Sequence, residues 1–266
     1  MYAFNYHRPD SVEAAAQALA ANEDAKLLAG GMTLLPTMKQ RLAMPSDLVD
    51  LSGIADLKGV RAEGDSLVVG AMTRHALVAG DATVQSKIPA LAKLAGGIGD
   101  PQVRNCGTIG GSIANADPAA DYPAAVLGLG ATVKTSKREI AADDFFTALF
   151  ETALEPGELI VSVHFPVPEA AAYAKFDNPA SRYAVVGVMV AKTAGGVRVA
   201  VTGAAPSVFR HGEMEQALAG NFAPEALDGI ATPADNLNGD LHASAEYRAH
   251  LVGVMAKRAV AAAAKG

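Results

Sequence analysis

The sequence predicts an α+β protein with two N-terminal subdomains and a small C-terminal α+β domain that has an antiparallel sheet. Segments of helical periodicity alternate with short β-branched runs through the first half of the chain, and the composition shifts near Gly53. Near the C-terminal side, alternating strands at 185–192 and 197–203 flank a glycine-containing turn. The expected units are subdomains at 1–55 and 56–170 and a C-terminal domain at 171–266.

The first subdomain is expected to alternate helices and strands. Ser11 is a suitable N-cap because serine side chains accept hydrogen bonds from the first free amides of a helix. The turn Glu63–Ser66 predicts a hairpin into the strand that follows it. In order, the elements are a helix at 11–21, a strand at 26–29, a helix at 34–41, a strand at 48–51, a strand that begins at 56–60, and a strand at 67–70.

In the second subdomain, Thr73 is expected to cap a helix, and Asp121 to cap another. The stretch Ile98–Asp117 has little periodicity and is expected to be a long functional loop. The remaining elements are helices at 74–79, 88–96, 122–129 and 143–149, strands at 131–135 and 159–165, and a last helix at 244–264.

The composition is that of a folded protein. Of 266 residues, 50% are hydrophobic and 19% are charged, which is enough to bury a core. The net charge of −6 and the lack of a basic stripe argue against nucleic-acid binding. No signal peptide is evident and no apolar run has the length of a transmembrane helix, so we expect a cytoplasmic protein.

The cysteine and histidine contents argue against a metal site in this chain. Cys106 is the only cysteine, so the chain has neither an intrachain disulfide nor the four thiolates that an iron–sulfur cluster usually takes. The six histidines are scattered without an i, i+4 pair. If the protein moves electrons among metals, we expect those metals on other polypeptides.

Two glycine pairs, Gly30-Gly31 and Gly110-Gly111, interrupt the pattern. Adjacent glycines let a ligand approach backbone amides, and consecutive amides form concave sites for phosphate oxygens. Each pair alone is weak support in a chain of 26 glycines, and neither has the G-x-G-x-x-G spacing of nicotinamide-binding folds. We expect both to be strand-end turns that meet in space and grip one diphosphate with their amides.

The residues around both pairs resemble the flavin subunits of molybdenum hydroxylases, which include the medium subunit of aerobic carbon monoxide dehydrogenase and the flavin subunit of xanthine dehydrogenases. The stretches Ala29–Pro36 and Thr108–Asp121 are similar to the two loops that hold the FAD pyrophosphate in that family. The resemblance extends over essentially the whole chain and in the family's order. Three further stretches carry it, at 70–75, 142–146 and 246–251.

The resemblance implies a fold, a cofactor and partners. The fold is a two-subdomain, PCMH-type (vanillyl-alcohol-oxidase-like) FAD-binding domain followed by the C-terminal domain. The cofactor is non-covalent FAD. The chain would take electrons from an iron–sulfur small subunit and pass them to a quinone, NAD or oxygen, while a molybdopterin large subunit oxidises the substrate, in a dimer of heterotrimers. No catalytic and no metal-binding residue is expected in this chain.

The resemblance also implies cofactor contacts. Glycine amides and the hydroxyls of Thr33, Thr108 and Ser112 would hold the diphosphate. Asn115 and Asp121 would bind ribityl or ribose hydroxyls, or be cap and turn residues. Lys175 would lie near the pyrimidine edge, or be a solvated lysine, and Tyr183 would face the ring, or pack between domains. The full set is Ala29, Gly30, Gly31, Met32, Thr33, Leu34, Thr108, Gly110, Gly111, Ser112, Asn115, Asp121, Lys175 and Tyr183.

Met32 and Ser112 depart from the family pattern, in which a polar residue and asparagine are more frequent. Two alternatives therefore stay open. A stand-alone flavin oxidoreductase would bind its own substrate in a pocket lined by titratable groups, and the sequence has no obvious cluster of that kind. A non-redox structural or assembly subunit would have lost FAD, so that the purified protein would be colourless.

Overall fold

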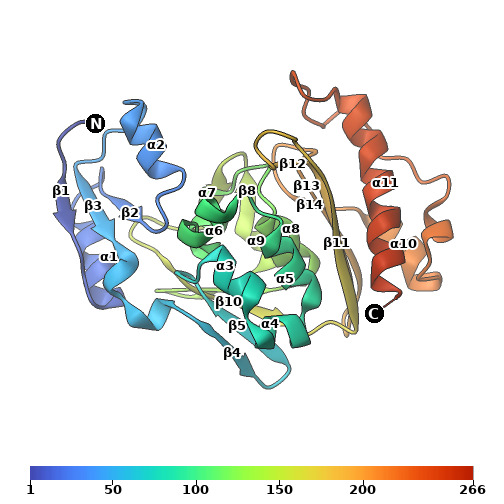
Figure 1. Ribbon diagram of the computed structural model, residues 1–266, viewed down its shortest axis with the longest axis horizontal. Helices are drawn as coiled ribbons and strands as arrows, with labels where there is room; N and C mark the ends of the chain where they lie inside the picture. Colours follow the sequence, from blue (N-terminus) through green and yellow to red (C-terminus); the bar gives the residue numbers. More distant parts are fainter. Residues whose placement is uncertain (266) are drawn as a thin grey trace.

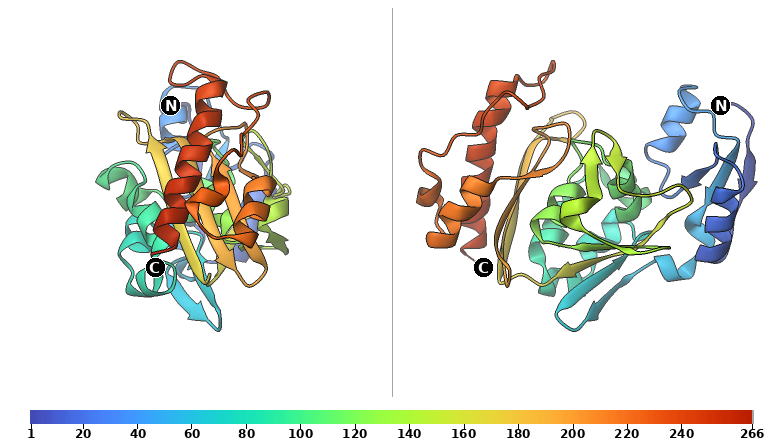
Figure 2. Two further views of the ribbon diagram at one scale, coloured as in Figure 1. Left: turned by 90° about the vertical axis from the view of Figure 1, so that its right-hand side faces the viewer. Right: turned by 180° about the vertical axis from the view of Figure 1, so that it is seen from behind.

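The computed structural model describes residues 1–265, so Gly266, the last residue of the expected C-terminal domain, lies outside the described residues. The chain forms three parts in a row, from the small N-terminal part in blue to the C-terminal helices in red (Figure 1). The view from behind shows the same order, with the middle part between the other two (Figure 2).

The N-terminal part is a three-stranded parallel sheet with two connecting helices. Its strands are β1 (Asn5–His7), β2 (Lys26–Leu28) and β3 (Asp47–Asp50), in the order β1-β3-β2. The connecting helices are α1 (Val12–Ala20) and α2 (Leu34–Lys39). Parallel neighbours need crossover connections, which the two helices provide. The side chain of Ser11 caps α1 as expected, accepting a hydrogen bond from the amide of Ala14 at 3.2 Å.

The middle part is a five-stranded antiparallel sheet covered by helices. The strands are β4 (Val60–Glu63), β5 (Ser66–Gly70), β6 (Thr132–Thr135), β7 (Glu139–Ala141) and β10 (Ile160–Pro166), in the order β4-β5-β10-β6-β7. The helices are α3 (His75–Gly80), α4 (Ala82–Lys87), α5 (Pro89–Gly96), α6 (Pro101–Cys106), α7 (Ile109–Asn115), α8 (Tyr122–Gly128) and α9 (Ala142–Phe145). Alternate residues of the sheet, such as Leu67, Val69 and Val163, are fully buried in the core that these helices share.

Short elements connect these parts. Two single-turn 3-10 helices, η1 (Leu51–Gly53) and η2 (Ala55–Leu57), lead from β3 to β4. A small hairpin, β8 (Phe146–Ala148) and β9 (Glu151–Thr152), precedes β10.

The C-terminal part is a four-stranded antiparallel sheet with helices on one face. Its strands are β11 (Ala170–Asp177), β12 (Ala184–Thr193), β13 (Gly196–Thr202) and β14 (Phe209–Arg210), in that order. The helices are α10 (Gly212–Gly220), the 3-10 turn η3 (Pro224–Leu227) and α11 (Ala245–Ala263). In Figure 1 this sheet is seen nearly edge-on, with α11 on one side and the helices of the middle part on the other.

Strand β12 joins two hydrophobic cores. Its first eight residues are all buried. Val188 and Val190 point into the core beneath α10 and α11, whereas Met189 and Ala191 belong to the core of the middle part. Successive side chains of a strand point to opposite faces, so a strand buried on both faces reads as a continuous apolar run. The C-terminal sheet is thus a layer between two sets of helices.

The mixed helix and strand class and the antiparallel C-terminal sheet are as predicted, but several element predictions were wrong. The expected loop at Ile98–Asp117 contains α6 and α7. The strand expected from Asp56 begins only at Val60, because Asp56 and Leu57 lie in the 3-10 helix η2. The expected helix 143–149 ends at Phe145. Thr73 does not cap α3, because its hydroxyl donates instead to the carbonyl of Gly59 at 3.0 Å. The sequence also missed α4, β7 and β11.

None of the helices in residues 1–265 is both long enough and apolar enough to cross a bilayer.

Gly128, at the end of α8, tests how tightly the middle part packs on the C-terminal sheet. A Cβ on Gly128 would lie 2.7 Å from Cγ and 3.0 Å from Cβ of Met189. We expect Gly128→Val to lower the free energy of unfolding by about 1–3 kcal/mol, the usual cost of overpacking a core. Chemical denaturation measures it.

Gly80→Ala is the matched control, because no atom lies within 4 Å of a Cβ built on Gly80. We expect it to be neutral or stabilising by less than about 1 kcal/mol. Equal destabilisation by both variants would contradict the packing that we describe.

Candidate functional site

The two glycine turns meet in space. A Cβ built on Gly30 would lie 2.7 Å from Cα of Gly107 and 2.8 Å from the carbonyl carbon of Cys106. In the second turn, a Cβ on Gly111 would lie 3.4 Å from Cβ of Ala29, the residue before Gly30. Real Cβ atoms do not approach a backbone so closely, so Gly30 allows the first turn to lie directly against the α6–α7 junction.

The first turn offers free backbone donors. Gly31 has φ +71°, the left-handed conformation that glycine adopts without strain and that occurs in anion-binding nests. Within residues 1–265, the amides of Gly30, Gly31, Met32 and Thr33 donate to no other residue. Thr33 precedes α2 without capping it, so its hydroxyl is also free. Four consecutive amides and a hydroxyl fit a diphosphate.

The second turn differs from the prediction. It is the first turn of α7, not a strand end, and its amides are used within the chain. Gly110 donates to the carbonyl of Ala71 at 2.8 Å, and Gly111 donates to the hydroxyl of Thr108 at 3.2 Å. The assignment of these two amides to a phosphate stays a prediction, although both have acceptors within the chain. A Cβ on Gly110 would lie 2.6 Å from Cβ of Ala71, so this glycine is needed for packing.

What the second turn offers to a ligand is hydroxyl groups. The Thr108 oxygen accepts from Gly111 and keeps its own proton to donate, and no described residue bonds to the Ser112 hydroxyl. Together with the first turn they form a neutral, donor-rich set without lysine. Phosphate oxygens accept from amides and hydroxyls, so the residues present fit the diphosphate of the FAD that the resemblance implies.

His75 lies beneath the junction of the two turns. A Cβ on Gly107 would lie 2.5 Å from Nε2 of His75, and the His75 ring lies 5.3 Å from that of Tyr122. The His75 side chain is 5% exposed, and its Nδ1 has no partner among the described residues. Burial, assisted by the nearby charge of Arg104, lowers the pKa of His75 to about 4. At pH 7 the His75 side chain is therefore uncharged and packs against the backbone of Gly107 beneath the site.

Asp121 is at the centre of a second group. Its carboxylate accepts from the hydroxyl of Tyr173 at 2.6 Å and forms a salt bridge with Lys175 at 3.1 Å. Burial raises the pKa of Asp121, and the charge of Lys175 opposes that shift. The Asp121 side chain does not cap α8, so that prediction was wrong. The sequence did not identify Tyr173, for which Gly187 leaves room on the neighbouring strand.

Lys175 is not the solvated lysine that the sequence favoured. Its side chain is 11% exposed. Besides Asp121, its ammonium donates to the carbonyls of Gly97 and Arg182, each at 2.9 Å. An ammonium group has three donors, so all three are used within the chain. Lys175 would then act on a flavin through its charge.

Helix α7 connects the two groups. Its first turn lies at the glycine junction, and Asn115 ends it shortly before Asp121. Seven helical residues span about 10 Å, so the two ends of α7 lie about this far apart. Tyr183 lies in the bend before β12 and is 47% exposed. Its partial burial and the negative charges of Asp117 and Asp121 raise the pKa of Tyr183.

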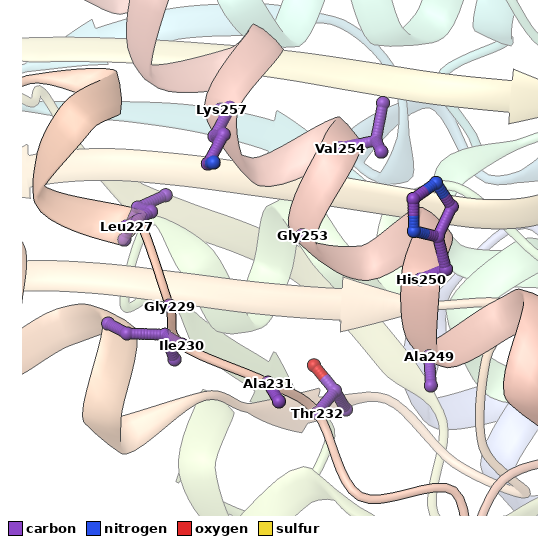
Figure 3. A pocket seen from close by; sticks show the side chains of 10 residues that line it. All are labelled: Leu227, Gly229, Ile230, Ala231, Thr232, Ala249, His250, Gly253, Val254 and Lys257. Carbon is purple, nitrogen blue, oxygen red and sulfur yellow. The ribbon is translucent and has the colours of Figure 1, made fainter.

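Two pockets of the described residues lie away from the glycine turns. One of about 410 Å³ lies between α11 and the segment from Leu227 to Thr232, as Figure 3 shows, and another of about 480 Å³ adjoins it. Neither is lined by an expected cofactor residue. We assign the candidate site from the donors that the first glycine turn leaves without acceptors. Residues 1–265 contain no group of three or more His, Cys, Asp or Glu side chains able to hold a metal.

Comparison with protein families and curated proteins gives matches over nearly the whole chain. Residues 2–168 match the family described as the FAD binding domain in molybdopterin dehydrogenase, and residues 171–263 match the CO dehydrogenase flavoprotein C-terminal domain. The carbon monoxide dehydrogenase medium chain of Afipia carboxidovorans is 39% identical over 275 residues, covering 97% of this chain and 95% of the relative. The nicotine 6-hydroxylase medium subunit of Paenarthrobacter nicotinovorans is 35% identical, covering 97% and 96%.

Solved structures agree with these matches. A chain of the carbon monoxide dehydrogenase from Hydrogenophaga pseudoflava has a TM-score of 0.90 and 38% identity, covering 99% of this chain and 98% of that one.

The buried His75 predicts a pH dependence of stability. The unfolded chain binds this proton with the ordinary pKa of 6.5 and the folded chain with a pKa of about 4. Stability is therefore full above pH 6.5 and is lost as pH falls toward 4. When the pH is lowered from 7 to 4.5, the free energy of unfolding should fall by about 2 kcal/mol more in the wild type than in His75→Leu. Denaturant unfolding at each pH measures this difference.

His250→Leu is the control, because His250 is an exposed histidine on α11. It should keep the pH dependence of the wild type. If His75→Leu keeps it too, His75 is not the group that titrates.

The Asp121–Lys175 pair predicts a second result. Lys175→Met leaves a buried carboxylate without its counter-charge, so we expect it to lower the free energy of unfolding by about 3 kcal/mol. Adding Asp121→Asn should recover part of this loss, because no buried charge then remains. Denaturant unfolding of the three proteins measures both effects.

Lys192→Met is the matched control on the same sheet. Its salt bridge to Glu169 is exposed, with side chains 50% and 59% accessible, so we expect a change below about 1 kcal/mol. A loss at Lys192 as large as that at Lys175 would contradict a buried pair.

Proposed function

We propose that this chain, which belongs to the family of FAD-binding subunits of molybdenum hydroxylases, is the electron-transfer subunit of such an enzyme. In this role it accepts electrons from an iron–sulfur subunit and passes them to an external acceptor. The observation that carries the proposal is the direct contact between Gly30 and the α6–α7 junction, beside four free amides.

FAD bound in this site supplies the redox chemistry, so the chain needs no general base. In the proposal the amides from Gly30 to Thr33, with the hydroxyls of Thr108 and Ser112, hold the diphosphate. Ala29 and Leu34 flank the first turn, and Gly110 and Gly111 let α7 pack against it. These assignments rest on the donors that the described residues leave free.

The other assignments concern the part of the site toward the C-terminal sheet. Asn115 and Asp121 bind hydroxyl groups of the cofactor, and Tyr183 faces the ring. Lys175 favours a reduced, anionic flavin through its positive charge, because attraction between opposite charges is strong where water is excluded. Its burial supports this role, whereas its salt bridge to Asp121 offsets part of the charge. The FAD is held without a covalent bond.

The partners in the proposal are a molybdopterin large subunit and an iron–sulfur small subunit, in a dimer of heterotrimers. The relatives are called medium chain or medium subunit, and their enzymes are named for carbon monoxide and for nicotine. Such different substrates for similar chains support a substrate site on another subunit. In the proposal the units of this chain are 1–55, 56–170 and 171–266. The family matches at 2–168 and 171–263 support the boundary near residue 170.

Gly30→Ala tests the site directly. A methyl group at this position meets the backbone of Cys106 and Gly107 and separates the two turns. We expect the dissociation constant for FAD to rise about tenfold to a hundredfold, since overpacking costs about 1–3 kcal/mol. Titration of the apoprotein with FAD, followed by flavin fluorescence, measures it.

Gly253→Ala is the control, because a Cβ there meets nothing within 4 Å. It should bind FAD like the wild type. A wild-type protein that takes up no FAD would refute the proposal, and so would unchanged FAD binding by Gly30→Ala.

A second measurement concerns electron flow. In the assembled three-subunit enzyme, the substrate of the large subunit should bleach the flavin absorption, whereas the same substrate should leave the isolated chain unchanged. Turnover of a small molecule by the isolated chain would instead favour a stand-alone oxidoreductase.

A further inference from the structure

Arg248, near the start of α11, is a buried cation that the proposed function does not use. Its side chain is 4% exposed. One terminal nitrogen donates to the carbonyls of Val185 at 2.6 Å and Gly203 at 2.9 Å, and the other donates to Asp240 at 2.7 Å. The guanidinium therefore joins the first turn of α11 to the start of β12 and to the residue after β13.

The two carbonyls that Arg248 binds belong to a close backbone contact. Gly203 has φ +84°, and a Cβ on it would lie 2.6 Å from the carbonyl oxygen of Ala184 and 2.7 Å from that of Val185. The chain leaves β13 at Gly203, so these strand ends lack the full set of ladder partners. Buried carbonyls need donors, and a guanidinium supplies several in one plane.

The same strand ends hold a segment of the middle part. The amide of Gly203 donates to the carbonyl of Pro118 at 2.7 Å, and that of Ala184 donates to Ala119 at 3.2 Å. The hydroxyl of Thr202 lies 2.9 Å from the carbonyl oxygen of Pro118 and 2.7 Å from that of Ala120. Residues 118–120 thus lie in a bracket of hydrogen bonds from the C-terminal sheet.

The bracketed segment leads directly to the site. It begins after Ala116, which ends α7 with φ +46°, and it continues into Asp121. Asp121 is fixed on its other side by Tyr173 and Lys175 of β11. The place of Asp121 relative to α7 therefore depends on how the ends of β12 and β13 are held.

A buried arginine is a costly way to hold them. Its charge must be desolvated, and replacing a buried ion pair by apolar residues is often neutral or stabilising. The carboxylate of Asp240 is 45% exposed, so it balances the charge only in part. A gain in stability alone therefore does not explain why an arginine is buried at this position. Its hydrogen bonds to the carbonyls of Val185 and Gly203 indicate that it fixes the positions of these two strand ends.

We propose that Arg248 is a positioning residue for the flavin site: it ties the ends of β12 and β13 so that they hold Pro118–Ala120 and place Asp121 against the cofactor. This inference rests on the proposed function, because it concerns residues assigned to FAD. The inference goes beyond the proposed function because Arg248 lies on α11, a helix that contains none of the residues assigned to the cofactor.

The first test needs no cofactor. Hydrogen exchange of the apoprotein reports the amides of Ala184 and Gly203, which donate to the bracketed segment. Arg248→Met removes the hydrogen bonds from the guanidinium to the carbonyls of Val185 and Gly203. Because one hydrogen bond to a charged group contributes more than about 1.4 kcal/mol, which corresponds to a factor of ten, we expect the protection of the two amides to fall at least about tenfold. Asp240→Asn keeps both carbonyl contacts and should retain the protection.

The second test measures FAD binding. Arg248→Lys keeps the charge but not the fork of donors, so it serves where Arg248→Met does not fold. We expect its dissociation constant for FAD to rise about tenfold, with a changed visible circular dichroism of the bound flavin. Arg258→Met, at an exposed arginine on the same helix, should bind FAD and give a flavin spectrum like the wild type.

A double-mutant cycle with Thr202→Val separates positioning from general weakening. If Arg248 acts through the bracket, the effects of Arg248→Lys and Thr202→Val on FAD affinity are not additive. Additive effects, or intact amide protection in Arg248→Met, would overturn the inference. So would loss of protection with unchanged FAD binding, which leaves the proposed function standing. A wild-type chain that binds no FAD refutes the proposed function itself, whatever the exchange data show.

Discussion

The proposed cofactor site depends on one contact, in which the backbone of Gly30 lies directly against the backbone of Cys106 and Gly107. This contact is where the N-terminal sheet and the middle part meet at the site. It brings a turn of free amides next to a helix start that carries hydroxyl groups. Because two backbones touch there, the position tolerates no side chain, and the neutral ring of His75 supports the junction from below.

The two glycine pairs serve different purposes. Gly31 takes a left-handed conformation and leaves its neighbours' amides without acceptors, as an anion site needs. Gly110 and Gly111 use their amides inside the chain, and their lack of side chains lets α7 lie close to Ala71 and Ala29. Similar sequences therefore contribute to one site by different means, one through ligand donors and the other through close packing.

Periodic elements were predictable from the sequence, whereas those stabilised by distant contacts were not. Helix α1 has an apolar repeat and a serine cap, and β12 and β13 flank a clear turn. Helix α7 has two glycines and only two large apolar residues, Ile109 and Ile113, which are buried by neighbours far along the chain. Asp121 has the sequence context of a cap, yet Tyr173 and Lys175, some fifty residues away, bind its carboxylate. Local chemistry indicates what a residue is able to do, and the tertiary fold decides which partner it has.

The layered position of β12 limits how this protein can be recombined with its relatives. Met189 and Ala191 contact the middle part, while Val188 and Val190 contact the terminal helices, so one strand serves both interfaces. A chimera cut near residue 170 would replace the residues that the C-terminal sheet contributes to the core of the middle part, among them Tyr173, Met189 and Ala191. Such exchanges should succeed only between parents whose strand residues match on the inner face, whatever the similarity of their helices.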